Sequence, residues 1–323
     1  MPLTRHPGGP ILTRTDIPAI APHLIDVTSV FNPGATLFRG HPLLLVRVQN
    51  RGRETFLLAA ESDDGVRWRV RDRAVRWRGL ERVPGLIHHL YDPRITRLGD
   101  DYLVGVAIDV DETCRIGIAR TRDFEELELL GLASTDDSRN GVLFPERIGG
   151  RYAMLERPNR FQPPDGPPTG DAIVLSCSDD LLRWERAGAV IAGRPHFWDE
   201  RIGAGPPPVK TRAGWLLVYH GVATHFGSAN IYQAGVVLLA LDDPSRVIAR
   251  GRYNILEPRA PYETTGQVPN VVFPSGWIVE GSKAGGFAPE DARVLLYYGA
   301  ADTVVGLATG TVRDLLAACR EGA

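Results

Sequence analysis

The chain has 323 residues, of which 43% are hydrophobic and 24% charged, so it carries enough apolar material to bury a large core. A formal net charge of -2 excludes a bulk basic surface for nucleic acid or an anionic membrane, and any cationic site has to be local. The first residues lack an apolar stretch of signal-peptide length, and no later run approaches the roughly 18 apolar residues of a membrane span. We therefore expect a soluble, cytoplasmic protein without a nucleic-acid or membrane partner.

The cysteines and histidines do not follow the spacing of a metal site. Cys114, Cys177 and Cys319 are odd in number and far apart, which favours reduced core thiols over a disulfide framework or a zinc site. No glycine-rich phosphate loop is present either. We expect neither a metal nor an organic cofactor.

A strand-like pattern recurs along the chain at intervals of roughly sixty residues. Each copy is rich in aromatic and β-branched residues, as strands are. A turn motif precedes each copy, for example FNPGA (31–35) and YDPRI (91–95), and an acidic turn often follows, as in ESDDGVRW (61–68). The five copies are HPLLLVRV (41–48), DDYLVGVAID (100–109), GRYAMLERP (150–158), GWLLVYHGV (214–222) and RVLLYYGAAD (293–302).

This repeat predicts an all-β, five-bladed β-propeller that occupies residues 1–323 as a single domain. A unit of roughly sixty residues with four short strands has the size of one blade. A β-sandwich or barrel is the main rival, but it does not explain a pattern that recurs five times. Helical signal is confined to TVRDLLAACRE, where Thr311 is expected to cap a short C-terminal helix that buries Val312, Leu315, Leu316 and Cys319.

Three tryptophans, Trp68, Trp184 and Trp215, recur within the repeat, and we assign them to packing between blades. Trp198 lies outside the repeat and is a candidate for the wall of a binding site. The proline-rich stretch RFQPPDGPPTGD (160–171) is expected to be a surface loop near the central funnel.

Polar residues at the same place in successive blades meet at one end of the axial funnel. The strand tips carry Arg47, Asp109, Arg157, His220 and Asp302, and the preceding motifs carry Asn32, Asp92, Arg139, Asn140, Glu146, Lys210 and Asn270. Carboxylates and asparagines suit the hydroxyl groups of a sugar. Arg139, Arg157 and Lys210 are too positive a set for a neutral sugar, and such groups usually hold phosphate or sulfate.

The balance of acids and cations decides between reaction types. An inverting glycosidase needs one carboxylic acid for the leaving oxygen and a second carboxylate to activate water. Phosphate is already an anionic nucleophile, so the enzyme has to supply cations that hold it in line and one proton donor. One candidate acid beside several cations therefore favours phosphorolysis over hydrolysis.

These motifs resemble the β-mannoside phosphorylases of glycoside hydrolase family 130 over essentially the whole chain. The strings that carry the resemblance are FNPGA, YDPRIT, SRNGVLFPERIGGRYAMLERP, GAGPPPVKTRAGWLLVYHGV, LEPRAPYETTGQVPNVVFPSGW and YYGAADT. The resemblance implies a five-bladed propeller with Asp92 as its single catalytic acid, which delivers its proton through the mannose 3-hydroxyl. Phosphate then attacks from the opposite face and releases α-mannose 1-phosphate.

The resemblance also implies which residues bind the two substrates, β-mannoside and inorganic phosphate. The phosphate pocket would contain Arg139, Arg157, Lys210, His220 and Tyr232. The mannose subsite would contain Asn32, Arg47, Arg53, Tyr91, Asn140 and Asp302, with Phe273 on the acceptor side. The motifs are closer to enzymes acting on mannobiose, mannooligosaccharides or mannosyl-N-acetylglucosamine than to those acting on mannosylglucose. Family members often self-associate, so a homo-oligomer is expected.

Two alternatives remain open at this stage. Some family members are hydrolases, and an inverting β-mannosidase would use a second carboxylate, with Glu146 as the candidate, to activate water. The other alternative is a noncatalytic propeller that only binds carbohydrate.

Overall fold

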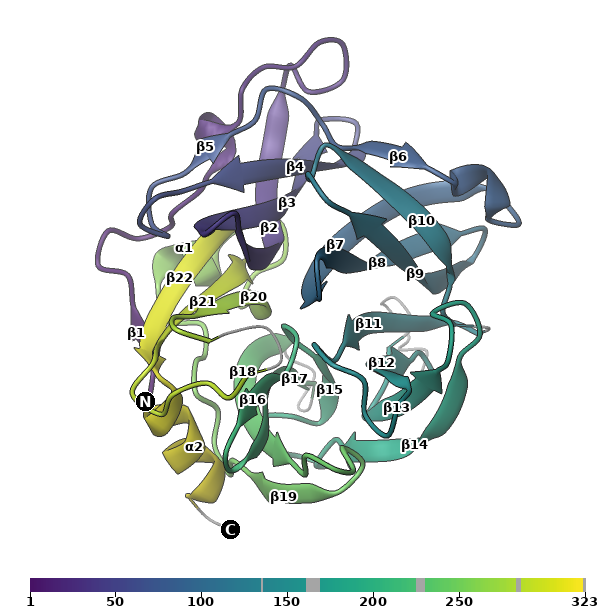
Figure 1. Ribbon diagram of the computed structural model, residues 1–323. Helices are drawn as coiled ribbons and strands as arrows, with labels where there is room; N and C mark the ends of the chain where they lie inside the picture. The colour runs from purple at the N-terminus through teal and green to yellow at the C-terminus, as the bar shows by residue number, and fades with distance from the viewer. Residues whose placement is uncertain (135, 161–168, 225–229, 283–285, 322–323) are drawn as a thin grey trace.

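The computed structural model describes residues 1–134, 136–160, 169–224, 230–282 and 286–321. Its strands form five sheets that surround a central axis, as Figure 1 shows. The predicted five-bladed propeller is confirmed. The segment 161–168, which forms most of the expected proline-rich surface loop, lies outside the described residues.

Four of the five sheets are formed by strands that follow one another in the chain (Figure 1). Blade 1 consists of β2 (Val27–Phe38), β3 (His41–Asn50), β4 (Thr55–Glu61) and β5 (Arg69–Val70). Blade 2 consists of β7 (Ile87–Leu98), β8 (Asp101–Val110), β9 (Thr113–Thr121), β10 (Glu126–Leu132) and β6 (Arg76–Arg78). Blade 3 consists of β11 (Ser138–Leu143), β12 (Tyr152–Pro158), β13 (Ala172–Ser178) and β14 (Glu185–Ala192). Blade 4 consists of β15 (Arg201–Ala204), β17 (Gly214–Ala223), β18 (Ile231–Leu239) and β19 (Val247–Arg250), with β16 (Val209–Thr211) paired to β17.

Blade 5 closes the ring with strands from both ends of the chain. Its inner strands are β20 (Val272–Val279), β21 (Arg293–Ala300) and β22 (Val304–Thr311), and its outer strand is β1 (Thr4–Arg5). β1 pairs with β22 in antiparallel register, with Arg5 opposite Ala308. Arg5 also donates to the buried carboxylate of Glu263, at 2.8 and 2.9 Å. The first described strand therefore completes the last blade.

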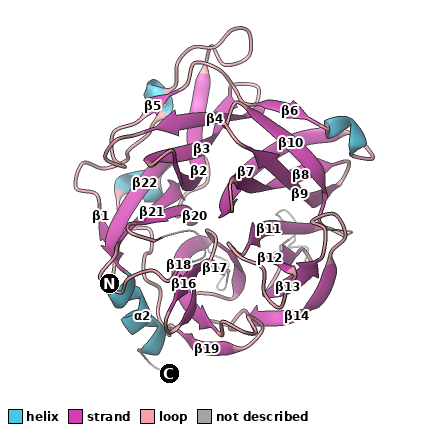
Figure 2. Cartoon of the chain, viewed as in Figure 1, coloured by secondary structure: helices cyan, strands magenta, loops and turns pink. Residues whose placement is uncertain are grey.

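Helices are few and short in the described part of the chain, and strands dominate it (Figure 2). They are α1 (Pro261–Thr264), α2 (Val312–Arg320) and two 3-10 turns at Arg14–Asp16 and Leu80–Arg82. In α2 the hydroxyl of Thr311 accepts a hydrogen bond from the backbone N–H of Asp314, and the buried residues are Val312, Leu315, Leu316 and Cys319. The predicted cap and buried face are both confirmed. None of the helices described is long and apolar enough to cross a membrane.

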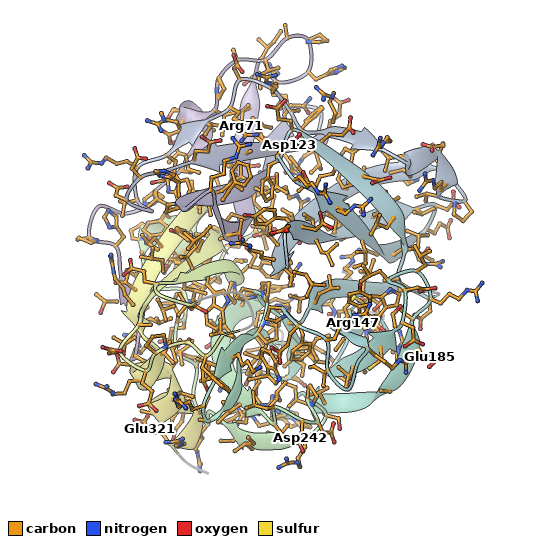
Figure 3. The ribbon with its side chains drawn as sticks, viewed as in Figure 1. Arg71, Asp123, Arg147, Glu185, Asp242 and Glu321 are labelled. Atoms are coloured by element: carbon orange, nitrogen blue, oxygen red, sulfur yellow. The ribbon has the colours of Figure 1, made fainter. Side chains whose placement is uncertain are left out.

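Aromatic contacts fill the spaces between neighbouring blades. Trp215 of blade 4 meets Phe144 of blade 3 edge to face, with ring centroids 5.2 Å apart. Trp68 of blade 1 meets Tyr297 of blade 5 in the same way at 5.6 Å. These two tryptophans therefore pack between blades, as predicted. Polar contacts add to this packing: a guanidinium N–H of Arg71 donates to the backbone oxygen of Asp123 in the next blade at 2.9 Å, and both residues are labelled in Figure 3.

Trp198 packs within blade 4. Its ring stacks on Tyr219 with centroids 5.8 Å apart, and its indole N–H donates to the backbone oxygen of Arg252 at 2.9 Å. Its neighbour Asp199 is fully buried and accepts hydrogen bonds from Arg194, Tyr219 and Arg250. The indole thus packs beside a buried polar network, and a role in the wall of a binding site stays a prediction.

Candidate active site

Three inner strands carry a bulge at the same place, and each bulge contains a polar residue with a left-handed backbone. The residues are Asn32 (φ 47°), Asp92 (φ 52°) and Asn140 (φ 58°). The strand register shifts at these positions in β2, β7 and β11. Asparagine and aspartate tolerate this backbone better than other side chains, and a bulge changes the direction of the side chain that it carries. The repeat thus directs three polar groups from neighbouring blades to one region near the axis.

Only one oxygen of the Asp92 carboxyl group is held by hydrogen bonds from the described residues. Its Oδ1 accepts hydrogen bonds from Nδ2 of Asn32 at 2.9 Å and from Nη1 of Arg47 at 3.1 Å. Oδ2 has no hydrogen-bond partner among the residues that the structure describes. The residue is 9% exposed. The carboxyl group is therefore oriented by the protein but keeps one oxygen available for a ligand.

A glycine makes room for this arrangement. A Cβ atom on Gly299 of β21 would overlap Oδ1 of Asn32. That oxygen is buried and has no hydrogen-bond partner in the described structure. Asn32 therefore holds Asp92 with its amide nitrogen, while its amide oxygen packs against the space left by the missing side chain of Gly299.

Arg47 connects Asp92 to the rest of the predicted mannose subsite. Its guanidinium packs over the rings of Phe31 and Tyr91, 4.6 and 4.4 Å from their centroids. Burial raises the pKa of Asp302 to about 6, which the charge of Arg47 opposes and that of Asp92 reinforces. The tip of blade 5 thus brings a second carboxyl group, that of Asp302, into the neighbourhood of Asp92.

Two arginines predicted to bind phosphate face each other across a strand pair. Arg139 of β11 is the register partner of Arg157 of β12, and the Nε atoms of both are buried without a hydrogen-bond partner. Burial and the nearby charge of Arg139 lower the pKa of Arg157 to about 10. Arg157 donates to the neutral Oδ1 of Asn159 at 2.8 Å, and Nη2 of Arg139 forms an ion pair with Oδ1 of Asp109 at 3.7 Å. These two cations are close together, and Arg157 has no carboxylate within ion-pair distance among the described residues.

His220 lies beside these arginines and is completely buried. Its two ring nitrogens have no hydrogen-bond partner in the part of the chain that the structure describes. Burial, followed by the charges of Arg157 and Arg94, holds its pKa well below 6.5, so the imidazole is neutral. The ring packs against Tyr232 and Phe273, with centroid distances of 6.1 and 4.7 Å. Phe273 therefore lies beside His220 and Tyr232, and its contribution to the acceptor side stays a prediction.

The structure does not bring Lys210 to this group, which corrects that prediction. Its ammonium is 2.7 Å from both carboxylate oxygens of Glu146. Lys210 pairs with Trp215, five residues before His220 on β17, a separation of roughly 16 Å at about 3.3 Å per strand residue. It lines a different pocket, with Thr36 and Thr96, which follow Asn32 and Asp92 on their strands. Lys210 and Glu146 therefore lie toward the opposite end of the propeller axis.

Arg53 lies at the exposed edge of the site. It occupies the hairpin between β3 and β4 with a left-handed backbone (φ 66°), and Nη1 donates to Oε1 of Gln267 from blade 5. The Nε2 of Gln267 is buried without a partner in the described chain. This pair spans the junction between the first and last blades.

Two further arginines near the site were missed from the sequence. Arg94 follows Asp92 by two residues and is only 1% exposed. Arg201 of β15 lies two residues before Gly203, which pairs with His220, so Arg201 and Gly203 occupy the same face of the strand. The available signal was that residues two positions apart on a strand lie on the same face, which relates Arg94 to Asp92 and Arg201 to Gly203. Arginines are too common in this chain for that spacing to single out these two.

The described residues contain no group of three or more His, Cys, Asp or Glu side chains arranged to hold a metal ion. The site brings together one oriented carboxyl group, a second carboxyl group with a raised pKa, a neutral imidazole and several buried arginines.

The matching family model and the similar proteins of known name all point to one family. The family model described as beta-1,4-mannooligosaccharide phosphorylase matches residues 2–321. A 1,2-beta-oligomannan phosphorylase of a Thermoanaerobacter species is 35% identical over 260 residues, which cover 79% of this chain and 78% of that protein. A beta-1,4-mannooligosaccharide phosphorylase of Ruminococcus albus is 30% identical over 318 residues, covering 97% and 89%.

A solved structure extends the similarity to three dimensions. The beta-1,2-mannobiose phosphorylase of Listeria innocua, in complex with beta-1,2-mannobiose, superimposes with a TM-score of 0.82 at 26% identity and covers 99% of this chain and 100% of that chain. The sequence match along nearly the whole chain and the shared propeller agree. The chain belongs to glycoside hydrolase family 130, the family of β-mannoside phosphorylases.

Proposed function

We propose that the protein cleaves a β-mannoside with inorganic phosphate and releases α-mannose 1-phosphate with inversion at the anomeric carbon. The main support is the pair Arg139 and Arg157, two buried guanidinium groups on adjacent strands with unpaired Nε atoms. Burying like charges together is unfavourable unless an anion joins them. Guanidinium groups bind phosphate oxygens with strong charge-assisted hydrogen bonds. Orthophosphate bound there would compensate the charge and be the nucleophile.

In the proposed reaction Asp92 is the proton donor. Asn32 and Arg47 hold Oδ1, so Oδ2 is the oxygen from which the proton would be transferred. It passes to the mannose 3-hydroxyl, whose own proton goes to the glycosidic oxygen as the C1–O bond breaks. A phosphate oxygen forms the new bond to C1 from the opposite face. The electron pair of the broken bond stays with the leaving sugar, and Asp92 ends as a carboxylate.

The sugar-binding side is formed by blades 1, 2 and 5. Asn32 and Asp302 offer acceptors to hydroxyl groups, and Arg47 and Tyr91 form part of the wall. Mannobiose, mannooligosaccharide and mannosyl-N-acetylglucosamine are the proposed substrates. The names of the two similar phosphorylases give β-1,2 linkages for one and β-1,4 linkages for the other, so acceptor and linkage have to be measured.

The hydrolytic alternative requires a base that activates water. Glu146, the candidate from the sequence, is bonded to Lys210 at a different pocket and is not near Asp92. A noncatalytic sugar-binding propeller has no need of buried, weakly compensated arginines. Neither alternative accounts for the arrangement of Arg139 and Arg157.

Two assays test the proposal. The first measures release of mannose and mannose 1-phosphate from β-1,2- and β-1,4-mannobiose with and without phosphate. The second supplies α-mannose 1-phosphate with a panel of acceptors and measures released phosphate. We expect activity only with phosphate in the first assay and phosphate release with at least one mannose or N-acetylglucosamine acceptor in the second. Equal mannose release without phosphate would overturn the proposal.

A further inference from the structure

Arg94 is a buried residue of β7 that joins three blades by hydrogen bonds. Its Nη1 donates to the backbone oxygen of Asp92 at 3.1 Å, within its own blade 2. Nη2 donates to Oδ1 of Asn140 in blade 3 at 3.1 Å. Nε and Nη2 reach the backbone oxygens of Gly205 and Ala204 at blade 4, at 3.0 and 3.3 Å. The guanidinium is therefore fixed in position by four hydrogen bonds.

All four acceptors are uncharged. Among the described residues no carboxylate lies within ion-pair distance of Arg94, although it is almost fully buried. Burial and repulsion from Arg157 lower its pKa to about 10, which the charge of Asp92 opposes, so the group remains a cation at neutral pH. A charge in a weakly polar interior acts over longer distances than one in water. The positive potential of Arg94 therefore extends into the space beside Arg157 and His220.

Arg94 also sets the direction of the Asn140 amide. Because Oδ1 of Asn140 accepts a bond from Arg94, Nδ2 has to point the other way. That nitrogen is buried without a partner in the described structure. A Cβ atom on Gly203 would overlap both Nδ2 of Asn140 and Cε1 of His220. Asn140 thus directs a donor into the region that His220 faces.

We propose that Arg94 is a positioning residue of the phosphorolytic reaction: it fixes the backbone of Asp92 and the amide of Asn140, and it keeps the phosphate site positive without contacting phosphate. This inference rests on the proposed function. A residue that only joined the blades would affect stability alone. The proposed role predicts two kinetic effects: the charge of Arg94 strengthens phosphate binding, and its hydrogen bonds keep kcat high by positioning Asp92 and Asn140.

The test compares Arg94→Met, Arg94→Lys and the matched control Arg97→Met. Arg97 lies on the same strand, is exposed and donates to the backbone oxygen of Gly99 at 3.2 Å. For each purified protein we would measure kcat, the KM for phosphate, the inhibition constant of sulfate and the thermal midpoint. Arg94→Lys keeps the charge but loses the planar set of donors.

We expect Arg94→Met to raise the phosphate KM and the sulfate inhibition constant about tenfold, because a buried charge near the anion is lost. Arg94→Lys should keep both constants within about twofold and lower kcat roughly tenfold, since small displacements of reacting groups are costly. Arg97→Met should change none of these values. If Arg94→Met does not fold, Arg94→Lys still tests the proposal, because its kcat should fall while its KM for phosphate stays nearly unchanged.

Unchanged kinetics in both Arg94 variants, or in Arg94→Lys alone where Arg94→Met is insoluble, would overturn the inference and leave the proposed function intact. Turnover by the wild-type protein that does not need phosphate would overturn the proposed function instead, and the sulfate constants would then show no dependence on the charge of residue 94.

Discussion

The side-chain amide of Asn32 donates a 2.9 Å hydrogen bond to Oδ1 of Asp92, a residue sixty positions further along the chain. Both residues occupy the left-handed position of equivalent bulges in neighbouring blades. The propeller repeat therefore supplies both the acid and the group that orients it. Arg47 shares the same oxygen, so the two contacts together limit rotation of the carboxyl group.

Replacing Asp92 with asparagine should abolish proton donation while preserving the shape of the site. We expect kcat to fall by at least about a thousandfold, within the range known for loss of a general acid. The thermal midpoint and sulfate binding should change little. The measurement is steady-state phosphorolysis together with calorimetric sulfate titration. Asp100→Asn, at an exposed turn of the same blade, is the control and should retain full activity. Substantial activity in Asp92→Asn would assign the acid to another residue.

Truncation of Arg157 should raise the KM for phosphate, whereas truncation of Lys210 should leave it unchanged. Arg157→Ala removes a buried cation beside Arg139 and should raise the phosphate KM tenfold or more, by about the strength of a charge-assisted hydrogen bond. Lys210→Ala should leave that KM unchanged, because its ammonium is bonded to Glu146 in a different pocket. Initial rates at varied phosphate concentration distinguish the two. A similar rise in both variants would place Lys210 at the phosphate after all.

The raised pKa of Asp302 predicts an unusual dependence of stability on pH. Its ordinary value is 3.8, and folding raises it to about 6, so the folded protein binds this proton more tightly than the unfolded chain. The contribution of Asp302 to the free energy of unfolding therefore falls as the pH rises from about 4 to about 6. Above that window its ionisation costs at most about 3 kcal/mol.

Asp302→Asn should remove this dependence. Relative to the wild type, we expect the variant to gain stability progressively between pH 4 and pH 6 and to keep the gain at pH 7. Urea unfolding at several pH values gives the difference. A constant difference across the window would show that the carboxyl group is ionised throughout.

The pair Arg5 and Glu263 should be important for stability. The Glu263 carboxylate is fully buried, and it also accepts from the hydroxyl of Tyr298 at 2.7 Å. Arg5→Met leaves this charge without its cation and should cost about 3 kcal/mol. Urea unfolding should show a loss below about 1 kcal/mol for the control Arg51→Met, whose pair with Asp26 is exposed. Equal losses of unfolding free energy in the two variants would mean that the ion pair of Arg5 with Glu263 does not stabilise the closed propeller.

Local patterns predicted most of the fold. The cap at Thr311 and the apolar spacing of α2 are encoded within a few neighbouring residues, and the repeat reveals the number of blades. The bulge residues Asn32 and Asp92 were recognised for the same reason. In blade 3 the equivalent of FNPG and YDPR is RNGV, where the strand register shifts between Arg139 and Val142.

Contacts between distant blades were harder to predict. Lys210 was grouped with the phosphate residues because it follows a turn motif, but prolines 206–208 separate β15 from a new strand, β16, that lies toward the other end of β17. Arg94 was overlooked because its burial depends on oxygens of Ala204 and Gly205, 110 and 111 residues further along the chain. The one local signal, its spacing of two residues from Asp92, does not show that the side chain of Arg94 is buried.

The pairing of β1 with β22 has a consequence for the order in which the blades form during folding. It joins Thr4 to Thr309, so this contact closes a very long loop of chain, and contacts of such sequence separation are slow to form. Blade 5 is therefore expected to be completed late. Asp302 lies between β21 and β22 of this blade, so its carboxyl group would reach the neighbourhood of Asp92 only at that late step.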